Sequence, residues 1–307
     1  MRPRISGGAA SRLAAAALLA AAALAWPLPA RAAPPRVSAL VAQSAAPYQQ
    51  ALAAFKRAWD GPVATHVMEF EEDALARVQA ERPQLVVAVG ARAAKAAQEL
   101  AGVPVVYCMV LDAKANGVGG PNLVGVPLEI PAKVQLAELK RLLPAAKTVG
   151  LVYNPARSSA EVKEAQAAAE ALSLSLVAAP ASSAAAFPEA LREVLPRAQA
   201  LWLLADPTVV TADTFRLMLE SAMAKRVPLV AFSDEFVRRG ALLSLSPDFE
   251  AVGIEAARLA RALSEGKKPG ELSAAQPRFK LVVNLGTARA LGVSLPQEAL
   301  KEAVQVQ

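Results

Sequence analysis

Short runs of apolar residues alternate with longer amphipathic segments along most of this chain. The first runs cover residues 37–43, 63–70, 84–90 and 103–110, and each is followed by a segment with helical spacing. Continuous apolar strands separated by amphipathic helices are typical of parallel sheets that are covered on both faces. The pattern therefore predicts an α/β fold.

A second series of the same kind begins after a connector rich in Gly, Pro and Asn at 111–131 and a helix predicted over 132–143. Its apolar runs are 148–154, 173–180, 199–206, 227–233 and 240–246, and a long helix (249–266) and a further strand (279–285) follow. We therefore predict two Rossmann-like lobes with parallel sheets, joined by a hinge that the chain crosses more than once. The predicted boundaries are 33–143 plus 246–278 for lobe 1, and 144–245 plus 279–307 for lobe 2.

Residues 1–32 have the composition of a removable export signal. A basic start precedes an apolar stretch from Leu13 to Trp26, and a small-residue site follows at 30–32. The apolar stretch is shorter than the roughly 20 residues that a membrane-spanning helix needs. We expect cleavage after Ala32 and a periplasmic, monomeric mature protein without membrane insertion.

The basic net charge comes largely from this N-terminal segment. The chain has 33 basic and 27 acidic residues, for a formal charge of +6. Arg2, Arg4, Arg12 and Arg31 lie in the first 32 residues, which contain no acidic residue. Because the remainder is nearly neutral and has no cluster of Lys and Arg, we expect no nucleic acid partner.

Motifs of catalysis and of metal binding are absent from the sequence. Cys108 is the only cysteine and His66 the only histidine, and each lies within an apolar run. An internal disulfide is therefore excluded, and a His/Cys metal site or a Cys-His nucleophile pair is not expected. The GxSxG, GxxxxGK[ST] and GxGxxG motifs do not occur at the required positions. We expect no enzyme activity, no cofactor and no metal.

Polar residues follow the apolar strands, where open parallel α/β sheets bind their ligands. The candidate ligand-binding residues are Gln43, Ser44, Arg92, Asp112, Asn154, Asp206, Ser233, Asp234 and Asp248. Carboxylates suit a cation, and hydroxyls at helix starts suit an anion, so the set favours a small zwitterion such as an amino acid.

These residues also have structural interpretations. Asn154, Asp206, Ser233, Asp234 and Asp248 all suit the N-cap of the helix that follows. Arg92 is either a clamp for a ligand carboxylate or a solvated residue of its helix. The functional interpretation therefore depends on the shared location of the set rather than on any one side chain.

Four segments carry a family resemblance: 121–155 (beginning PNLVGVPLEIP), 200–210 (ALWLLADPTVV), 227–260 (beginning VPLVAFSDEF) and 281–296 (LVVNLGTARALGVSLP). With them the chain resembles the substrate-binding proteins of ABC transporters, in the family related to tryptophan-binding and other amino-acid-binding proteins. The resemblance implies a type I periplasmic-binding fold, a ligand enclosed by hinge closure between two lobes, and an ABC permease as partner. The loops at 90–94 and 111–113 depart from the family's usual pattern, which leaves the contribution of the first lobe to specificity open.

Three functional hypotheses follow from these observations. The first is a solute-binding protein for an amino-acid-like or carboxylate ligand. The second is a periplasmic sensor that presents its ligand-closed form to a signalling receptor. The third is an exported enzyme with Asp206, Asp234 or Asp248 as a base, which the missing nucleophile-base pair disfavours. DNA-binding regulators that share the core fold are excluded, since no helix-turn-helix precedes the first strand.

Overall fold

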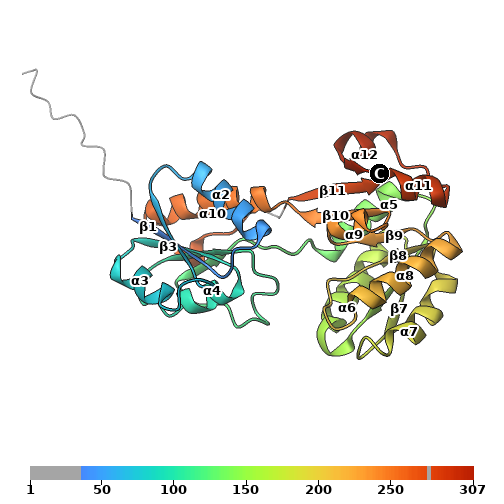
Figure 1. Ribbon diagram of the computed structural model, residues 1–307, viewed down its shortest axis with the longest axis horizontal. Coiled ribbons are helices and arrows are strands. Elements are labelled where there is room, and N and C mark those ends of the chain that lie inside the picture. The colour runs from blue at the N-terminus through green and yellow to red at the C-terminus, as the bar shows by residue number, and fades with distance from the viewer. Residues whose placement is uncertain (1–35, 275–277) are drawn as a thin grey trace, which may run out of the picture. The chain divides into compact units, whose positions relative to one another are not determined.

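The computed structural model describes residues 36–274 and 278–307, in which helices and strands alternate as the sequence pattern predicts (Figure 1). The strands form one sheet of five strands and one of seven, and helices cover both faces of each sheet. The prediction of an α/β fold with two mainly parallel sheets is confirmed. The proposed export signal lies outside the described residues.

The first sheet is entirely parallel and has the order β2-β1-β3-β4-β5. Its strands are β1 (Val37–Val41), β2 (Val63–Val67), β3 (Leu85–Val89), β4 (Val105–Cys108) and β5 (Leu123–Gly125). The helices packed on it are α2 (Ala46–Ala58), α3 (Ala74–Ala80), α4 (Ala91–Ala97) and α10 (Phe249–Ser264), and the 3-10 helix η2 (Pro269–Glu271) lies near β5.

The first sheet is apolar on both faces because helices cover both. Successive strand residues point to opposite sides, so Val87 of β3 packs in the cluster formed with α2 and α10, while Val86 packs in the cluster formed with α3 and α4. All residues of β1 and β3 are buried. Burial on both faces explains why these strands read as uninterrupted apolar runs.

The second sheet has the order β12-β11-β10-β9-β8-β6-β7. Its strands are β6 (Thr148–Tyr153), β7 (Ser175–Pro180), β8 (Ala200–Trp202), β9 (Leu229–Ala231), β10 (Leu243–Pro247), β11 (Phe279–Asn284) and β12 (Val304–Val306). Its helices are α5 (Ala132–Leu142), α6 (Pro155–Ala171), α7 (Phe187–Val194), α8 (Ala212–Lys225), α9 (Asp234–Arg238), α11 (Leu285–Leu291) and α12 (Gln297–Glu302), with the 3-10 helix η1 (Leu195–Arg197) after α7.

One pair of strands in the second sheet is antiparallel. The chain leaves β10 at Pro247, forms α10 on the first sheet, and returns to the second sheet as β11. Phe279, the first residue of β11, lies opposite Pro247. Because the chain re-enters at the end where it left, β11 runs antiparallel to β10 and is an exception within the predicted parallel sheets.

Two short strands were not predicted. β5 lies within the connector rich in Gly, Pro and Asn at 111–131, where no strand was expected, and its Leu123 and Val124 are buried beside β4. β12 lies near the C-terminus and pairs with β11. The apolar run around β5 is broken by Gly125 and Pro127, and that of β12 by Gln305, so neither is marked as a strand in the sequence. β8 and β9 are equally short, but they lie within the longer apolar runs 199–206 and 227–233.

The helix α5 packs with the second sheet, although the predicted lobe 1 extends to residue 143. Leu136, Leu139 and Leu142 lie in the same hydrophobic cluster as strand residues of β6 and β10. A division into lobes would therefore fall before α5, within the 126–131 segment. The two-lobe boundaries otherwise stay a prediction.

Candidate functional site

A buried carboxylate organises the edge of the second sheet where β6 and β8 end. Asp206 is 2% exposed. Its Oδ2 accepts hydrogen bonds from the backbone N–H of Asn154 (3.1 Å) and from Oγ of Ser158 (2.8 Å). Its Oδ1 accepts from the backbone N–H of Thr208 (3.0 Å) and from its Oγ1 (2.6 Å). The four donors use the acceptor capacity of this carboxylate within the protein.

The pKa of Asp206 lies below its ordinary value even though the side chain is buried. Burial is the largest single influence and raises the pKa, because it disfavours the charged form. The hydrogen bonds from Thr208, Ser158 and Asn154 together outweigh burial. Asp206 is therefore held as a carboxylate that joins the start of α6 to the loop after β8.

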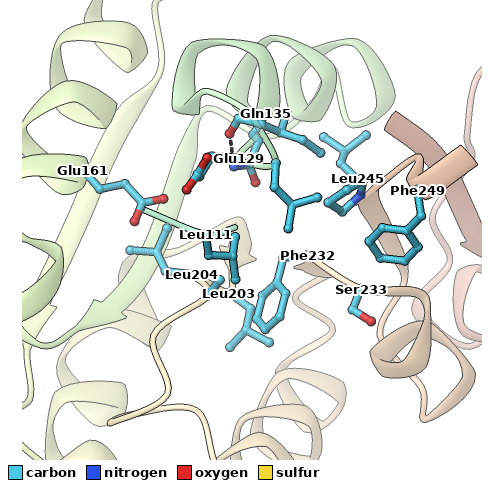
Figure 2. Close-up of a pocket in the computed structure, with 14 residues that line it drawn as sticks. Leu111, Glu129, Gln135, Glu161, Leu203, Leu204, Phe232, Ser233, Leu245 and Phe249 are labelled. Carbon is cyan, nitrogen blue, oxygen red and sulfur yellow. Dashed lines mark hydrogen bonds between the residues drawn. The ribbon is translucent and has the colours of Figure 1, made fainter. Parts of the chain in front are cut away.

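A largely apolar pocket of about 250 Å³ lies close to this network. Figure 2 shows the residues around it, with Phe232 and Ser233 on one side and Gln135 and Glu129 on another. The full lining consists of Leu111, Leu128, Glu129, Ile130, Gln135, Glu161, Leu203, Leu204, Ala205, Phe232, Ser233, Leu245, Pro247 and Phe249. We refer to this cavity as the leucine-lined pocket.

The walls of the leucine-lined pocket come from several strand ends and from the connections between the sheets. The segment 203–205 follows β8, and Phe232 follows β9. Leu111 follows β4 of the first sheet, and the segment 128–130 connects β5 to α5. Phe249 begins α10. The pocket thus lies where residues that are distant in sequence converge beyond the carboxyl ends of strands, as expected for open α/β sheets.

The polar groups of the pocket are two carboxylates, an amide and a hydroxyl. Gln135 donates from Nε2 to the carbonyl oxygen of Ile130 (2.7 Å) and accepts from the indole N–H of Trp202 (3.1 Å), so both ends of its amide are engaged. The Oγ of Ser233 accepts from the backbone N–H of Glu235 (3.3 Å). Glu129 accepts from the backbone N–H of Asp112.

Glu161, on α6, has an elevated pKa. Desolvation by the surrounding protein is the largest cause, and the negative charges of Asp206, Glu164 and Glu129 add to it. Figure 2 shows the carboxylates of Glu161 and Glu129 on the same side of the pocket. The pocket therefore combines apolar walls with a local concentration of negative charge.

The residues predicted from the first series of strands lie at strand ends but do not line this pocket. Gln43 and Ser44 follow β1, and the backbone N–H of Ser44 donates to Glu69 Oε2 (2.7 Å). Arg92 lies exposed in the first turn of α4. Asp112 caps its own loop by accepting from the backbone N–H of Ala115 (2.9 Å). Their role in binding stays a prediction.

Of the residues predicted from the second series, the pocket includes Ser233. Asn154, Ser233 and Asp248 are N-caps of α6, α9 and α10, as their structural interpretation states. Asp248 also forms an ion pair with Lys280 at 3.4 Å. Asp234 is exposed and lies 3.9 Å from Arg238. Direct ligand contacts of these residues also stay predictions.

The pocket lies beside several of the strand ends at which ligand contacts were predicted, but most of the residues that line it were not among the predicted ones. Leu111, Ala205 and Phe232 each directly precede a predicted polar residue, and Phe249 follows one. Adjacent residues in an extended segment point in different directions, so the polar residue caps a helix or turn while its apolar neighbour contacts the pocket. Glu129 and Glu161 lie away from strand ends, and no motif marks them.

No group of three or more His, Cys, Asp or Glu side chains in the described ranges is arranged to hold a metal ion. Within residues 36–274 and 278–307, no helix combines the length and apolarity that crossing a bilayer requires. His66, the lone histidine, bonds to Glu71 and Glu81 at 2.9 Å each, and Cys108 is buried in β4.

Solved structures support the fold assignment. A ligand-free, open structure of a substrate binding protein with adhesive properties from Clostridium difficile has a TM-score of 0.76, at 18% identity over 89% of this chain and 99% of that one. A Streptococcus pneumoniae ABC domain in complex with L-Trp has a TM-score of 0.60, at 23% identity over 90% of this chain and 100% of the other. These similarities identify the type I periplasmic-binding fold.

Sequence comparison extends the similarity to the family. A tyrosine-binding protein of Clostridioides difficile is 23% identical over 221 residues, which are 69% of this chain and 64% of that protein. The chain thus spans less than two thirds of this curated relative. The family described as ABC transporter substrate binding protein matches residues 62–307. With most of its length matched, and with its two mainly parallel sheets, the chain belongs to the ABC transporter substrate-binding protein family.

Proposed function

We propose that this chain captures a small amino-acid-like ligand outside the cytoplasm and delivers it to an ABC permease. The observation that carries the proposal is the leucine-lined pocket, which lies beyond the carboxyl ends of strands in a chain of a substrate-binding family. Its walls suit a ligand with a sizeable apolar part. The tyrosine-binding relative and the L-Trp complex of a structural neighbour support an aromatic amino acid as a candidate.

The proposed mechanism is closure of two lobes around the ligand. The pocket includes Leu111, which follows a strand of the first sheet, and Phe232, which follows a strand of the second. A ligand that contacts both groups more extensively in a closed form stabilises that form by its differential affinity. The segments that connect the sheets at 126–131 and at 248 belong to the candidate hinge. The closed form would then be the one that the permease recognises.

Binding is tested by thermal shift and calorimetry with a panel of amino acids, small peptides, organic acids and sugars. A ligand with a Kd of about 1 μM, present at 100 μM, stabilises the folded state by about 2.7 kcal/mol. For a protein of this size that corresponds to a rise in Tm of roughly 4 to 5 °C. No stabilisation by any compound of a broad panel would contradict the proposal.

A matched pair of variants tests whether the ligand binds in the leucine-lined pocket. Leu111 is 51% exposed and lines the pocket, whereas Ile254 is 50% exposed and does not. Leu111→Ala should weaken ligand binding by about tenfold through lost apolar contact. Ile254→Ala removes a similar exposed side chain on α10 and should leave the Kd unchanged. Equal effects of the two variants would place the ligand elsewhere.

A further inference from the structure

The leucine-lined pocket contains negative but no positive side chains. Among its fourteen lining residues, the ionisable ones are Glu129 and Glu161. No Lys, Arg or His contributes to the lining. A carboxylate ligand would therefore meet two like charges and no guanidinium or ammonium group, while an ammonium group would meet two partners.

The carboxylates are also the polar groups of the pocket with the most free hydrogen-bonding capacity. Both ends of the Gln135 amide are used, by Ile130 and Trp202. Glu129 accepts one backbone N–H, from Asp112, which leaves most of its acceptor sites available. Glu161 forms no hydrogen bond or ion pair with another described residue. The free hydrogen-bonding sites of the pocket are therefore mainly acceptor sites, which suit the N–H donors of a ligand.

The surroundings make the negative charge of Glu161 costly without a cation. Apolar side chains such as Leu203 and Leu204 line the same pocket and desolvate Glu161 on that side, while the rest of its side chain is exposed. Glu129 lies near Glu161 and repels it, as do Asp206 and Glu164. A ligand ammonium placed between Glu129 and Glu161 offsets this repulsion by attracting both carboxylates.

We propose that the leucine-lined pocket recognises the cationic amino group of a ligand with an apolar body, and that this recognition does not require a ligand carboxylate. The inference rests on the proposed function and narrows its ligand class. It predicts that aromatic or aliphatic amines bind as well as the corresponding amino acids. One feature near the pocket favours an anion instead of a cation. The first-turn N–H groups of α5, which begins at Ala132, have no side-chain cap and carry a positive partial charge.

Two sets of three compounds test separately how the amino group and the carboxylate of the ligand contribute to binding. The first set is L-tyrosine, tyramine and 3-(4-hydroxyphenyl)propionate, and the second is L-tryptophan, tryptamine and indole-3-propionate. Calorimetry with the full folded protein at pH 7 measures each Kd. We expect each amine to bind within a few fold of its amino acid in at least one set, and neither acid to bind.

A pair of variants tests the role of the carboxylate. Glu161→Gln keeps the shape of the side chain and removes its charge, and it should weaken amine binding by about tenfold. Glu170→Gln makes the same change on an exposed residue of α6 that does not line the pocket, and it should leave the Kd unchanged. Because Glu161 and Glu170 are both exposed, both variants should fold, which equal Tm values of the free proteins would verify.

The outcomes distinguish this inference from the proposed function. Binding of the acids as tightly as the amines, or binding of the amino acids but not the amines, overturns the cation inference and leaves ligand capture intact. The same holds if a neutral or anionic compound of the wider panel binds while all six compounds fail. If no compound of the whole panel binds, both proposals are contradicted.

Discussion

Gly253 of α10 lies directly against the backbone of α2 at Ala51. A β-carbon built on Gly253 would lie 2.0 Å from the carbonyl oxygen of Ala51 and 2.9 Å from Cβ of Ala54. Neither neighbour can move without displacing α2, since a backbone carbonyl is fixed by its helix. The close approach of α2 and α10, side by side in Figure 1, therefore depends on the absence of a side chain at this position.

Gly253→Ala should destabilise the protein by about 2 kcal/mol or more, because overpacking costs that much even where neighbours can adjust. Urea unfolding measures the change. Gly119→Ala is the control, since a β-carbon there has no neighbour within 4 Å, and it should shift the unfolding free energy by less than about 0.5 kcal/mol. Equal stability of the two variants would mean that α2 and α10 are less closely packed than the structure shows.

Stability should depend on the protonation of His66. Its Nδ1 lies 2.9 Å from Glu71 and its Nε2 lies 2.9 Å from Glu81, whose other oxygen accepts from Ser38 (2.5 Å). Burial, the largest influence, lowers the pKa of His66, but the hydrogen bonds and charges of the two glutamates together outweigh it. The net pKa lies above 6.5. Nearby, Arg77 pairs with Asp73 and lies 3.8 Å from Glu71.

A raised folded-state pKa of His66 contributes stability below the unfolded value of about 6.5, and that contribution is lost as the pH rises through the folded pKa. The difference in unfolding free energy between the wild type and His66→Gln should therefore shrink from pH 6 to pH 8.5. Because His66 is the only histidine, its imidazole NMR signal reports the pKa without ambiguity. A measured pKa below 6.5 would contradict the assignment.

Asp206→Ala should destabilise the protein by about 3 kcal/mol, since it leaves the buried donors of Asn154 and Ser158 and the half-buried donors of Thr208 without their acceptor. The control Asp234→Ala removes an exposed carboxylate 3.9 Å from Arg238 and should cost less than about 1 kcal/mol. Chemical denaturation of both variants provides the comparison. A small effect at Asp206 would argue against its role in organising the end of the second sheet.

Cys108 should be unreactive toward thiol reagents until the protein unfolds. It is 1% exposed, and burial raises the pKa of its thiol to about 12. The thiolate is the reactive form, so both access and ionisation protect the side chain at pH 8. Labelling with a chromogenic disulfide should proceed at the rate of unfolding and increase with urea concentration. Rapid labelling of the folded protein would show that β4 is accessible.

The fold could be predicted from the sequence with few errors, because its strands are buried on both faces. Runs such as 84–90 are continuously apolar, and the helices between them have clear amphipathic spacing. The errors occur where this signal is missing or the path is not local. β5 and β12 lie in apolar runs that Gly, Pro or Gln residues interrupt, and the direction of β11 follows from where the chain re-enters the second sheet.

The candidate site was predictable only as a location. Polar residues at strand ends mark the edge of a sheet, but Asn154, Ser233 and Asp248 act there as helix caps. Asp206 shows the same limit. Its position after β8 was recognised, but its hydrogen-bond donors are Thr208 in its own loop and Asn154 and Ser158 at the start of α6. A residue type alone does not distinguish a capped helix from a ligand contact.

The sequence by itself determined the α/β class, the order of the elements and the strand ends near which a ligand pocket could form, since these depend on local periodicity and on the general geometry of parallel sheets. Only the tertiary structure decided which side chains line the pocket. Glu129, from a connecting segment, and Glu161, from the middle of a helix, line the same pocket, and the charge of Glu129 contributes to the raised pKa of Glu161. The proximity of these two residues depends on long-range packing, which produces no periodic pattern in the sequence.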